Sequence, residues 1–333
     1  MFVSFFLLVG LLFSPVHGMA APPGPGPAFS DPQGVVSKPD SWQKEPIHRE
    51  EVSQKARVAL TLDQHLYTAF LPIIQEYAKM HTLEVAVRQG TCGNSEALLN
   101  KKQVDIAGFC CPPALTDRLP GLRFHSVGIV GLAILVHADN PVESLTEQQA
   151  RDLFSGVIRN WSEVLPEEAK ARFSLPVRPV GRLHCPTRPG HWRLILNDRE
   201  QFSLDMAEVG NVSDMISSVA SYRGAVGYEI LWNLDRFGKD KPIKAVRING
   251  FASDDTEALV KGVYPFFRVN TLTHWENPES ANPEALDLVR HIESQVEQMP
   301  VKYHVVPAQR LQQAGWPFLG DELIGLPLHD KKP

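Results

Sequence analysis

Residues 58–70 read VALTLDQHLYTAF and join a short apolar run directly to the first turns of a helix. Val58–Leu60 is expected to be a strand and His65–Met80 a helix, because apolar side chains recur there at helical spacing. A second strand is expected at Leu83–Val87, followed by another helix, and a third strand at Asp105–Phe109. Strands that alternate with helices predict a parallel sheet whose faces are covered, and therefore an α/β fold.

The second half of the chain continues the α/β pattern. Val127–Val136 is a nearly continuous apolar run, typical of one buried central strand. Ser144–Gln148 contains a capping-box pattern, which indicates the start of a helix. Further strands are expected at Gly224–Tyr228 and Ile243–Ile248, and Glu284–Gln298 is an amphipathic helix.

Composition describes an ordinary globular protein large enough for two domains. The chain has 333 residues, of which 43% are hydrophobic and 21% charged, and its net charge is −5. This balance gives no basic field of the kind that attracts nucleic acid. The sequence has no Ser/His/Asp order, phosphate loop or dinucleotide fingerprint, so an enzyme is not expected.

The N-terminus predicts export. Residues 1–20 form an apolar stretch ending in a small-x-small site, as in a secretory signal peptide, with a retained membrane anchor as the alternative. Residues 21–55 are rich in proline and are expected to form a flexible leader without packed structure. The mature protein is therefore placed in the periplasm or another extracytoplasmic compartment, where disulfides are favoured.

All four cysteines fall in three loop-like segments: Gly90–Ser95, Phe109–Pro113 and Arg182–Arg188. Glycine, proline, serine and threonine surround them, which are residues typical of turns. If the three loops converge, the protein has a pocket lined by thiols or disulfides.

Several segments in order resemble the phosphate-type substrate-binding proteins, the periplasmic receptors of ABC importers. Asn140–Thr146, Asp152–Gly156 and Asn160–Ser162 are similar to that family's "NP-x-x-x-LT … IFSG … NW" signature. Val104–Ala107, Gly224–Tyr228 and Tyr264–Arg268 look like its "aDig", "aIGY" and "YPlxR" motifs. The resemblance covers roughly residues 56–300.

The resemblance implies two α/β lobes of the type II periplasmic-binding-protein fold, with the ligand in the cleft between them. Lobe one is expected at residues 56–137 and 263–333, and lobe two at residues 138–262. The chain is accordingly expected to be a monomeric, non-enzymatic receptor for a small ion or oxyanion. Their closed form is recognised by an ABC permease or a membrane histidine kinase.

Ligand-binding residues are expected in the loops that follow the strands, where helix N-termini present free N–H groups. Carried over from the family, they are Thr61, Asp63, Cys92, Gly93, Asn94, Cys110, Cys111, Cys185, Thr187 and Arg188. Asp63 also suits a helix N-cap. Arg182 and Arg188 flank the Cys185 loop and could neutralise an anion, or they could be solvated or paired on the surface. Every loop but the first departs from the family by gaining cysteine, and Pro186 removes a backbone donor.

Two interpretations of the cysteines stay open. In the first, Cys92, Cys110, Cys111 and Cys185, with His65 and His184, bind a soft ion such as Cu(I) or arsenite, and no other cofactor is expected. In the second, cysteines pair as structural disulfides and the cleft binds phosphate or another oxyanion. A third hypothesis, from another class of function, is a periplasmic redox or metal-handling protein that reuses the fold.

Overall fold

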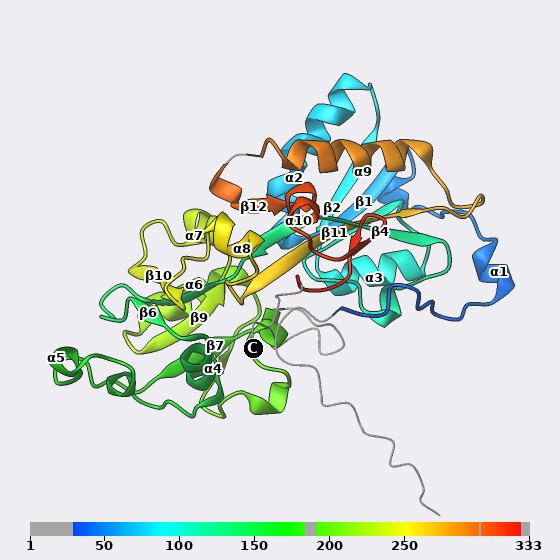
Figure 1. Cartoon of the computed structure of the whole chain (residues 1–333). Coiled ribbons are helices and arrows are strands. Elements are labelled where there is room, and N and C mark those ends of the chain that lie inside the picture. Colours follow the sequence, from blue (N-terminus) through cyan, green and yellow to red (C-terminus); the bar gives the residue numbers. More distant parts are fainter. Residues whose placement is uncertain (1–28, 184–190, 300, 328–333) are drawn as a thin grey trace, which may run out of the picture.

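The computed structural model describes residues 29–183, 191–299 and 301–327. Within them the chain forms two lobes, each built around a six-stranded sheet (Figure 1). The first sheet has the order β12-β4-β11-β3-β1-β2 and the second β6-β10-β5-β9-β7-β8. The strands of the first are β1 (Val58–Asp63), β2 (Val85–Gly90), β3 (Ile106–Phe109), β4 (Leu122–Gly131), β11 (Phe267–Trp275) and β12 (Val305–Pro307). Those of the second are β5 (Ala133–His137), β6 (Ser144–Leu145), β7 (Arg178–Gly181), β8 (Ala207–Glu208), β9 (Ala225–Glu229) and β10 (Ile243–Ile248). This confirms the expected two-lobe α/β fold.

The pairing of β1 confirms the expected parallel sheet in the first lobe. β1 runs parallel to β2 on one side and to β3 on the other. β11, which comes from the C-terminal half of the chain, pairs antiparallel with both β3 and β4. The carboxyl ends of β1, β2 and β3 therefore meet at one edge, and the loops that follow them come together there.

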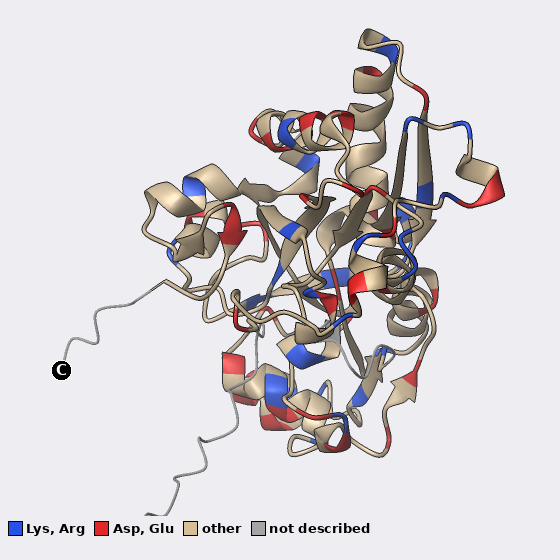
Figure 2. Ribbon diagram, turned by 90° about the vertical axis from the view of Figure 1, so that its right-hand side faces the viewer, with Lys and Arg blue, Asp and Glu red and all other residues tan. Residues whose placement is uncertain are grey.

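Helices cover both sheets. Lobe one carries α2 (Gln64–Met80), α3 (Cys92–Asn100), α9 (Pro283–Val296) and α10 (Ala308–Gln313), and lobe two carries α4 (Glu147–Ser155), α6 (Val212–Ser221) and α7 (Leu231–Phe237). α2 and α9 pack together through apolar side chains, as their sequence periodicity predicts. In residues 29–183, 191–299 and 301–327, no helix combines the length and apolarity needed to cross a membrane. Figure 2 shows acidic and basic residues interspersed over both lobes.

The crossing between the lobes differs from the expected single strand. The apolar run of residues 127–136 is divided at Leu132 between β4 in the first sheet and β5 in the second. The N–H of Leu132 donates to the carbonyl of Phe266 on the returning chain, at 2.8 Å. The lobe boundary thus lies near residue 132, not 137. The sequence did not show it, because residues 127–136 are buried in both strands and hydropathy alone cannot separate them.

Residues 29–55 do not form the structureless leader that their proline content suggested. The short helix α1 (Asp40–Gln43) lies in this segment, and the ring of Trp42 contacts Trp275 with a centroid separation of 6.0 Å. The Nζ of buried Lys102 donates to the carbonyls of Gln43 and Glu45. The segment is held because it packs a half-buried indole ring against Trp275 and adds two carbonyl acceptors for the Lys102 ammonium, which also donates to Ser280. The expected signal peptide lies outside the described residues, as do residues 21–28 of the leader.

Candidate functional site

A buried polar cluster lies where the lobes meet. Asp63 ends β1 and Cys92 begins the helix after β2, while Cys110 directly follows β3. Glu229 ends β9 in the other lobe, and its carboxylate contacts the ring of His65 in lobe one. These side chains are all at least nine-tenths buried. The cluster therefore occupies the position at which open parallel sheets bind ligands, beyond the carboxyl ends of their strands.

His65 joins the two lobes. Asp63 is the N-cap of α2, and its Oδ1 accepts from the backbone N–H of His65 at 2.9 Å and from the ring Nδ1 at 2.6 Å. The other ring nitrogen, Nε2, lies 3.2 Å from Oε1 of Glu229. An imidazolium that donates from both nitrogens to two carboxylates is the arrangement that suits this geometry.

The electrostatics of this triad favour the charged form of each member. Burial and Arg268 would lower the pKa of His65, but the two carboxylates raise it to about 10. Burial would raise the pKa of Asp63, but the charge and hydrogen bonds of His65, together with Arg268, bring it down to about 2. The pKa of Glu229 is held far below its ordinary value, because Arg182 and His65 outweigh the effect of burial.

Glu229 is the centre of the network in lobe two. Its Oε1 accepts from the backbone N–H of Ile230 at 2.9 Å and from Nδ2 of Asn233 at 3.1 Å. Its Oε2 lies 3.2 Å from an Nη of Arg182, which follows β7 and is fully buried. The carboxylate is thus fixed by its own lobe before it contacts His65.

Two cysteine sulfurs lie against this triad. The Sγ atoms of Cys92 and Cys110 are 3.6 Å apart, and Cys92 Sγ lies 3.7 Å from Oδ2 of Asp63. An Nη of Arg268, from β11, lies 3.4 Å from Cys110 Sγ. Cys111 is also buried, and none of these three cysteines forms a disulfide.

Both close thiols are neutral in this setting. The contact with Cys92, burial and the charge of Asp63 raise the pKa of Cys110. The contact with Cys110 lowers the pKa of Cys92, but Cys111, burial and Asp63 more than reverse that effect. With neutral thiols, three cations (His65, Arg182 and Arg268) face two carboxylates, so the cluster carries one net positive charge.

The geometry of this cluster also suits a metal ion. One ligand atom each from Asp63, His65 and Cys110 lies within 4.8 Å of the others, and Cys92 adjoins this group. As an imidazolium His65 has no lone pair to offer, so it would have to lose a proton before it could bind a metal. Two thiolates bound tetrahedrally at ~2.3 Å would place their sulfurs about 3.8 Å apart. The sulfur separation of 3.6 Å is close to that value.

The structure brings together only some of the expected site residues. Asp63, His65, Cys92, Cys110 and Cys111 are brought together in lobe one. Thr61 is fully buried on β1, and its Oγ1 has no hydrogen-bond partner among the described residues. Asn94 is exposed and completes the α3 capping box with Thr91, while Gly93 lies in the same first turn. His184, Cys185, Thr187 and Arg188 lie outside the described residues.

Sequence reasoning missed the ionic half of the site. For Arg182 both a surface position and a role in neutralising an anion were left open; it is fully buried and faces Glu229. Glu229 and Arg268 lie at the ends of two motifs that were used only to identify the fold. One signal was available for Glu229. It directly follows the apolar run Ala225–Tyr228, at the carboxyl end of a strand, and a charged side chain that is buried there needs partners. The helix expected near Trp192–Leu196 is a short 3-10 turn at His191–Leu194.

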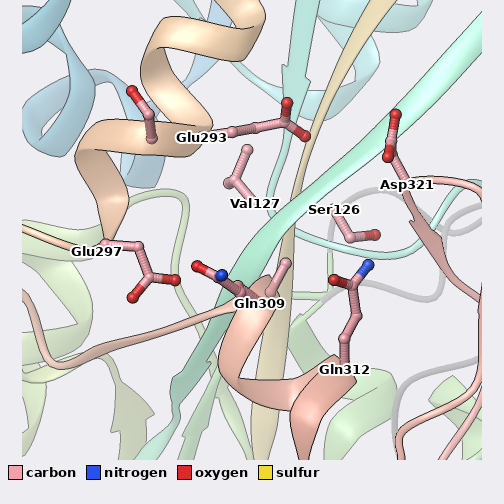
Figure 3. A pocket seen from close by; sticks show the side chains of 9 residues that line it. Ser126, Val127, Glu293, Glu297, Gln309, Gln312 and Asp321 are labelled. Carbon is pink, nitrogen blue, oxygen red and sulfur yellow. The ribbon is translucent and has the colours of Figure 1, made fainter.

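A separate cavity of about 340 Å³ lies within lobe one (Figure 3). Its walls come from β4, α9, α10 and the turn before β14 (Glu322–Leu323), and they carry the carboxylates of Glu293, Glu297 and Asp321. Because one lobe supplies the whole lining, lobe closure would not assemble this cavity. The interlobe cluster is therefore the stronger candidate for a receptor site.

Comparisons with known proteins agree with this architecture. A family model described as a PBP superfamily domain matches residues 50–273. The crystal structure of an ABC-type phosphate transport receptor from Vibrio cholerae matches with a TM-score of 0.60 and 19% identity, over 75% of this chain and 99% of the receptor. A putative phosphate ABC transporter substrate-binding protein with bound phosphate, from Clostridium perfringens, matches with a TM-score of 0.58 and 17% identity, over 75% and 99%. At these identities the likeness to the two structures is one of fold.

Proposed function

The chain belongs to the PBP superfamily, and on that premise we propose that it is an exported solute-binding protein. It captures a small ligand between its lobes, and a membrane partner recognises the closed form. An ABC permease is the partner favoured by the receptors of similar fold, and a sensor histidine kinase is the alternative. No catalytic role is proposed, because the polar groups of the cluster bind one another and its thiols are neutral.

The proposed ligand is a thiophilic ion, such as Cu(I) or arsenite, bound by Cys92 and Cys110. The observation that carries this is the sulfur pair at 3.6 Å, with Asp63 and His65 beside it. Sulfur ligands select soft ions over hard ones. An oxyanion has fewer donors here than the fold usually offers, because Asp63 already accepts from the N–H of His65, and Pro112 and Pro113 have no N–H.

Charge balance is consistent with this ligand. Cu(I) held by two thiolates carries one negative charge and would neutralise the single positive charge of the cluster, with release of two protons. Arsenous acid would instead condense with two neutral thiols, forming two arsenic–sulfur bonds and releasing two waters. Only the Cu(I) complex neutralises the buried cluster; the arsenic adduct is neutral and leaves its one positive charge in place, so charge balance favours Cu(I).

A second candidate is a singly charged oxyanion such as dihydrogen phosphate. The guanidinium groups of Arg182 and Arg268 favour it, because both are buried at the cleft and suit oxyanion recognition. It would also neutralise the cluster. In this candidate the cysteines are spectators or form disulfides, and Asp63 would accept a hydrogen bond from a hydroxyl of the protonated ligand.

Binding measurements on the mature protein test these candidates. We expect calorimetry under reducing, anaerobic conditions to show tight binding of Cu(I) or arsenite and none of phosphate. Cys92→Ser and Cys110→Ser should each abolish soft-ion binding without unfolding the protein. Ser95→Ala, which removes a buried hydroxyl from the same helix as Cys92, serves as the matched control.

Three outcomes would redirect the proposal. Phosphate binding that survives both cysteine substitutions would establish the oxyanion receptor. A thiol titration of the native protein that finds no free thiols would favour structural disulfides. Soft-ion binding that is unchanged in Cys110→Ser would remove the sulfur pair as the site.

A further inference from the structure

A groove between the lobes lies next to the buried cluster. It is a cavity of about 310 Å³ lined by polar side chains from lobe one and lobe two: Gln64, Gln89, Asn211, Ser213, Asn233 and Arg236. Beside the groove, one hydrogen bond joins the two lobes: an Nη of Arg236 on α7 donates to Oγ1 of Thr68 on α2 at 2.9 Å. We call this hydrogen bond the clasp. The closed arrangement of the lobes therefore forms this groove.

The groove shares its inner wall with the cluster. Gln64 lies between Asp63 and His65 in the chain. Asn233 is buried and donates through Nδ2 to Glu229, the carboxylate that contacts His65. The groove is thus the outer part of the same interlobe cleft, one residue away from the network that we assign to the ion.

The lining indicates the chemistry of an occupant. Its charged member is Arg236, and carboxamides and a hydroxyl supply the other polar groups. A guanidinium has five N–H donors, so Arg236 can hold Thr68 and a carboxylate together. The first turn of α6 adds backbone N–H groups, while the nearby carboxylate of Asp214 is held by the side chain of Asn211. Val212 and Phe237 contribute the apolar part of the lining, and the Arg236 guanidinium lies 4.9 Å from the centre of the Phe237 ring.

We propose that this groove binds a small organic carboxylate as a second ligand of the cleft. The cavity holds about ten non-hydrogen atoms, if each takes the roughly 30 Å³ that one water molecule occupies in the liquid. The inference deepens the proposed function, on which it rests, because both ligands would occupy one cleft. Since the carboxylate would contact both lobes, it stabilises the closed form and raises the affinity for the ion.

The test uses the mature protein and lactate, succinate and malate as probes. At least one probe is expected to bind saturably in calorimetry. Arg236→Gln should weaken that binding about tenfold or more, which is the usual effect of losing a charge-assisted hydrogen bond. Thr68→Ala is the matched control, because it removes the clasp and leaves the guanidinium; its effect should be clearly smaller.

Three results would overturn the proposal: no saturable binding of any probe, equal binding by Arg236→Gln, or equal losses in Arg236→Gln and Thr68→Ala. The last would assign Arg236 a role in the clasp alone. The double variant Cys92→Ser/Cys110→Ser separates the two proposals. Carboxylate binding by that variant supports the groove even where soft-ion binding fails, and its loss shows that the groove has no site of its own.

Discussion

Replacing His65 by glutamine removes the charge that joins the lobes while nearly preserving side-chain size. The imidazolium contacts one carboxylate in each lobe, at 2.6 and 3.2 Å, and is fully buried. Its pKa rises from 6.5 to about 10 in the folded protein. At 1.36 kcal/mol for each pKa unit, the network stabilises protonated His65 by roughly 4 kcal/mol at pH 7.

The pH dependence of this loss has a defined sign. The folded-state pKa of His65 lies above its unfolded value, so its contribution is complete below about pH 6.5 and is lost as pH rises toward 10. Urea unfolding of the parent and His65→Gln should therefore differ by about 4–5 kcal/mol from pH 6 to 7 and by less than about 1 kcal/mol near pH 10. Exposed His48, replaced in the same way, should change stability by less than about 0.5 kcal/mol.

Two results would refute this reasoning. If His65→Gln is as stable as the parent at pH 7, the ion triad does not contribute to stability. If the loss is the same at pH 7 and pH 10, the cause is packing and not the charge.

Two further predictions concern the framework of the site. Trp42→Ala removes the ring that contacts Trp275 and lies beneath the ammonium of Lys102; it should cost about 2–4 kcal/mol and speed proteolysis within residues 40–55, and unchanged cleavage would show that the segment is held by other contacts. Gly131→Ala places a Cβ 1.9 Å from the carbonyl oxygen of Ser253 at the lobe crossing and should destabilise the protein by at least about 2 kcal/mol in urea unfolding. Gly210→Ala, where a Cβ meets nothing within 4 Å, is the control, and equal stability of the two variants would contradict the prediction.

Local sequence patterns predicted the first lobe well because its elements are regular. The helix after Asp63 and the amphipathic helix near Glu284–Gln298 were found from apolar spacing. The lobe crossing was not found, because β4 and β5 are both buried and read as one apolar run. The packing of residues 29–55 was missed because it depends on a few distant contacts, such as the one between Trp42 and Trp275.

Only the part of the candidate site that lies in lobe one could be predicted from the sequence. Cys92, Cys110, Asp63 and His65 follow strands that pair within one sheet, so their convergence could be inferred from strand order. Glu229 comes from the other lobe, and its contact with His65 spans 164 positions in sequence. No local pattern encodes a pairing of that kind, and the ionic character of the cleft became visible only in the folded chain.

X-ray absorption of the loaded protein tests the central claim most directly. Mature protein is loaded with Cu(I) or arsenite under reducing conditions, and the ligand atoms are read from the copper or arsenic edge. The proposed site predicts two sulfur ligands in the parent, supplied by Cys92 and Cys110, and no copper or arsenic retained by Cys110→Ser. A first shell of oxygen and nitrogen alone in the parent would contradict the thiophilic receptor.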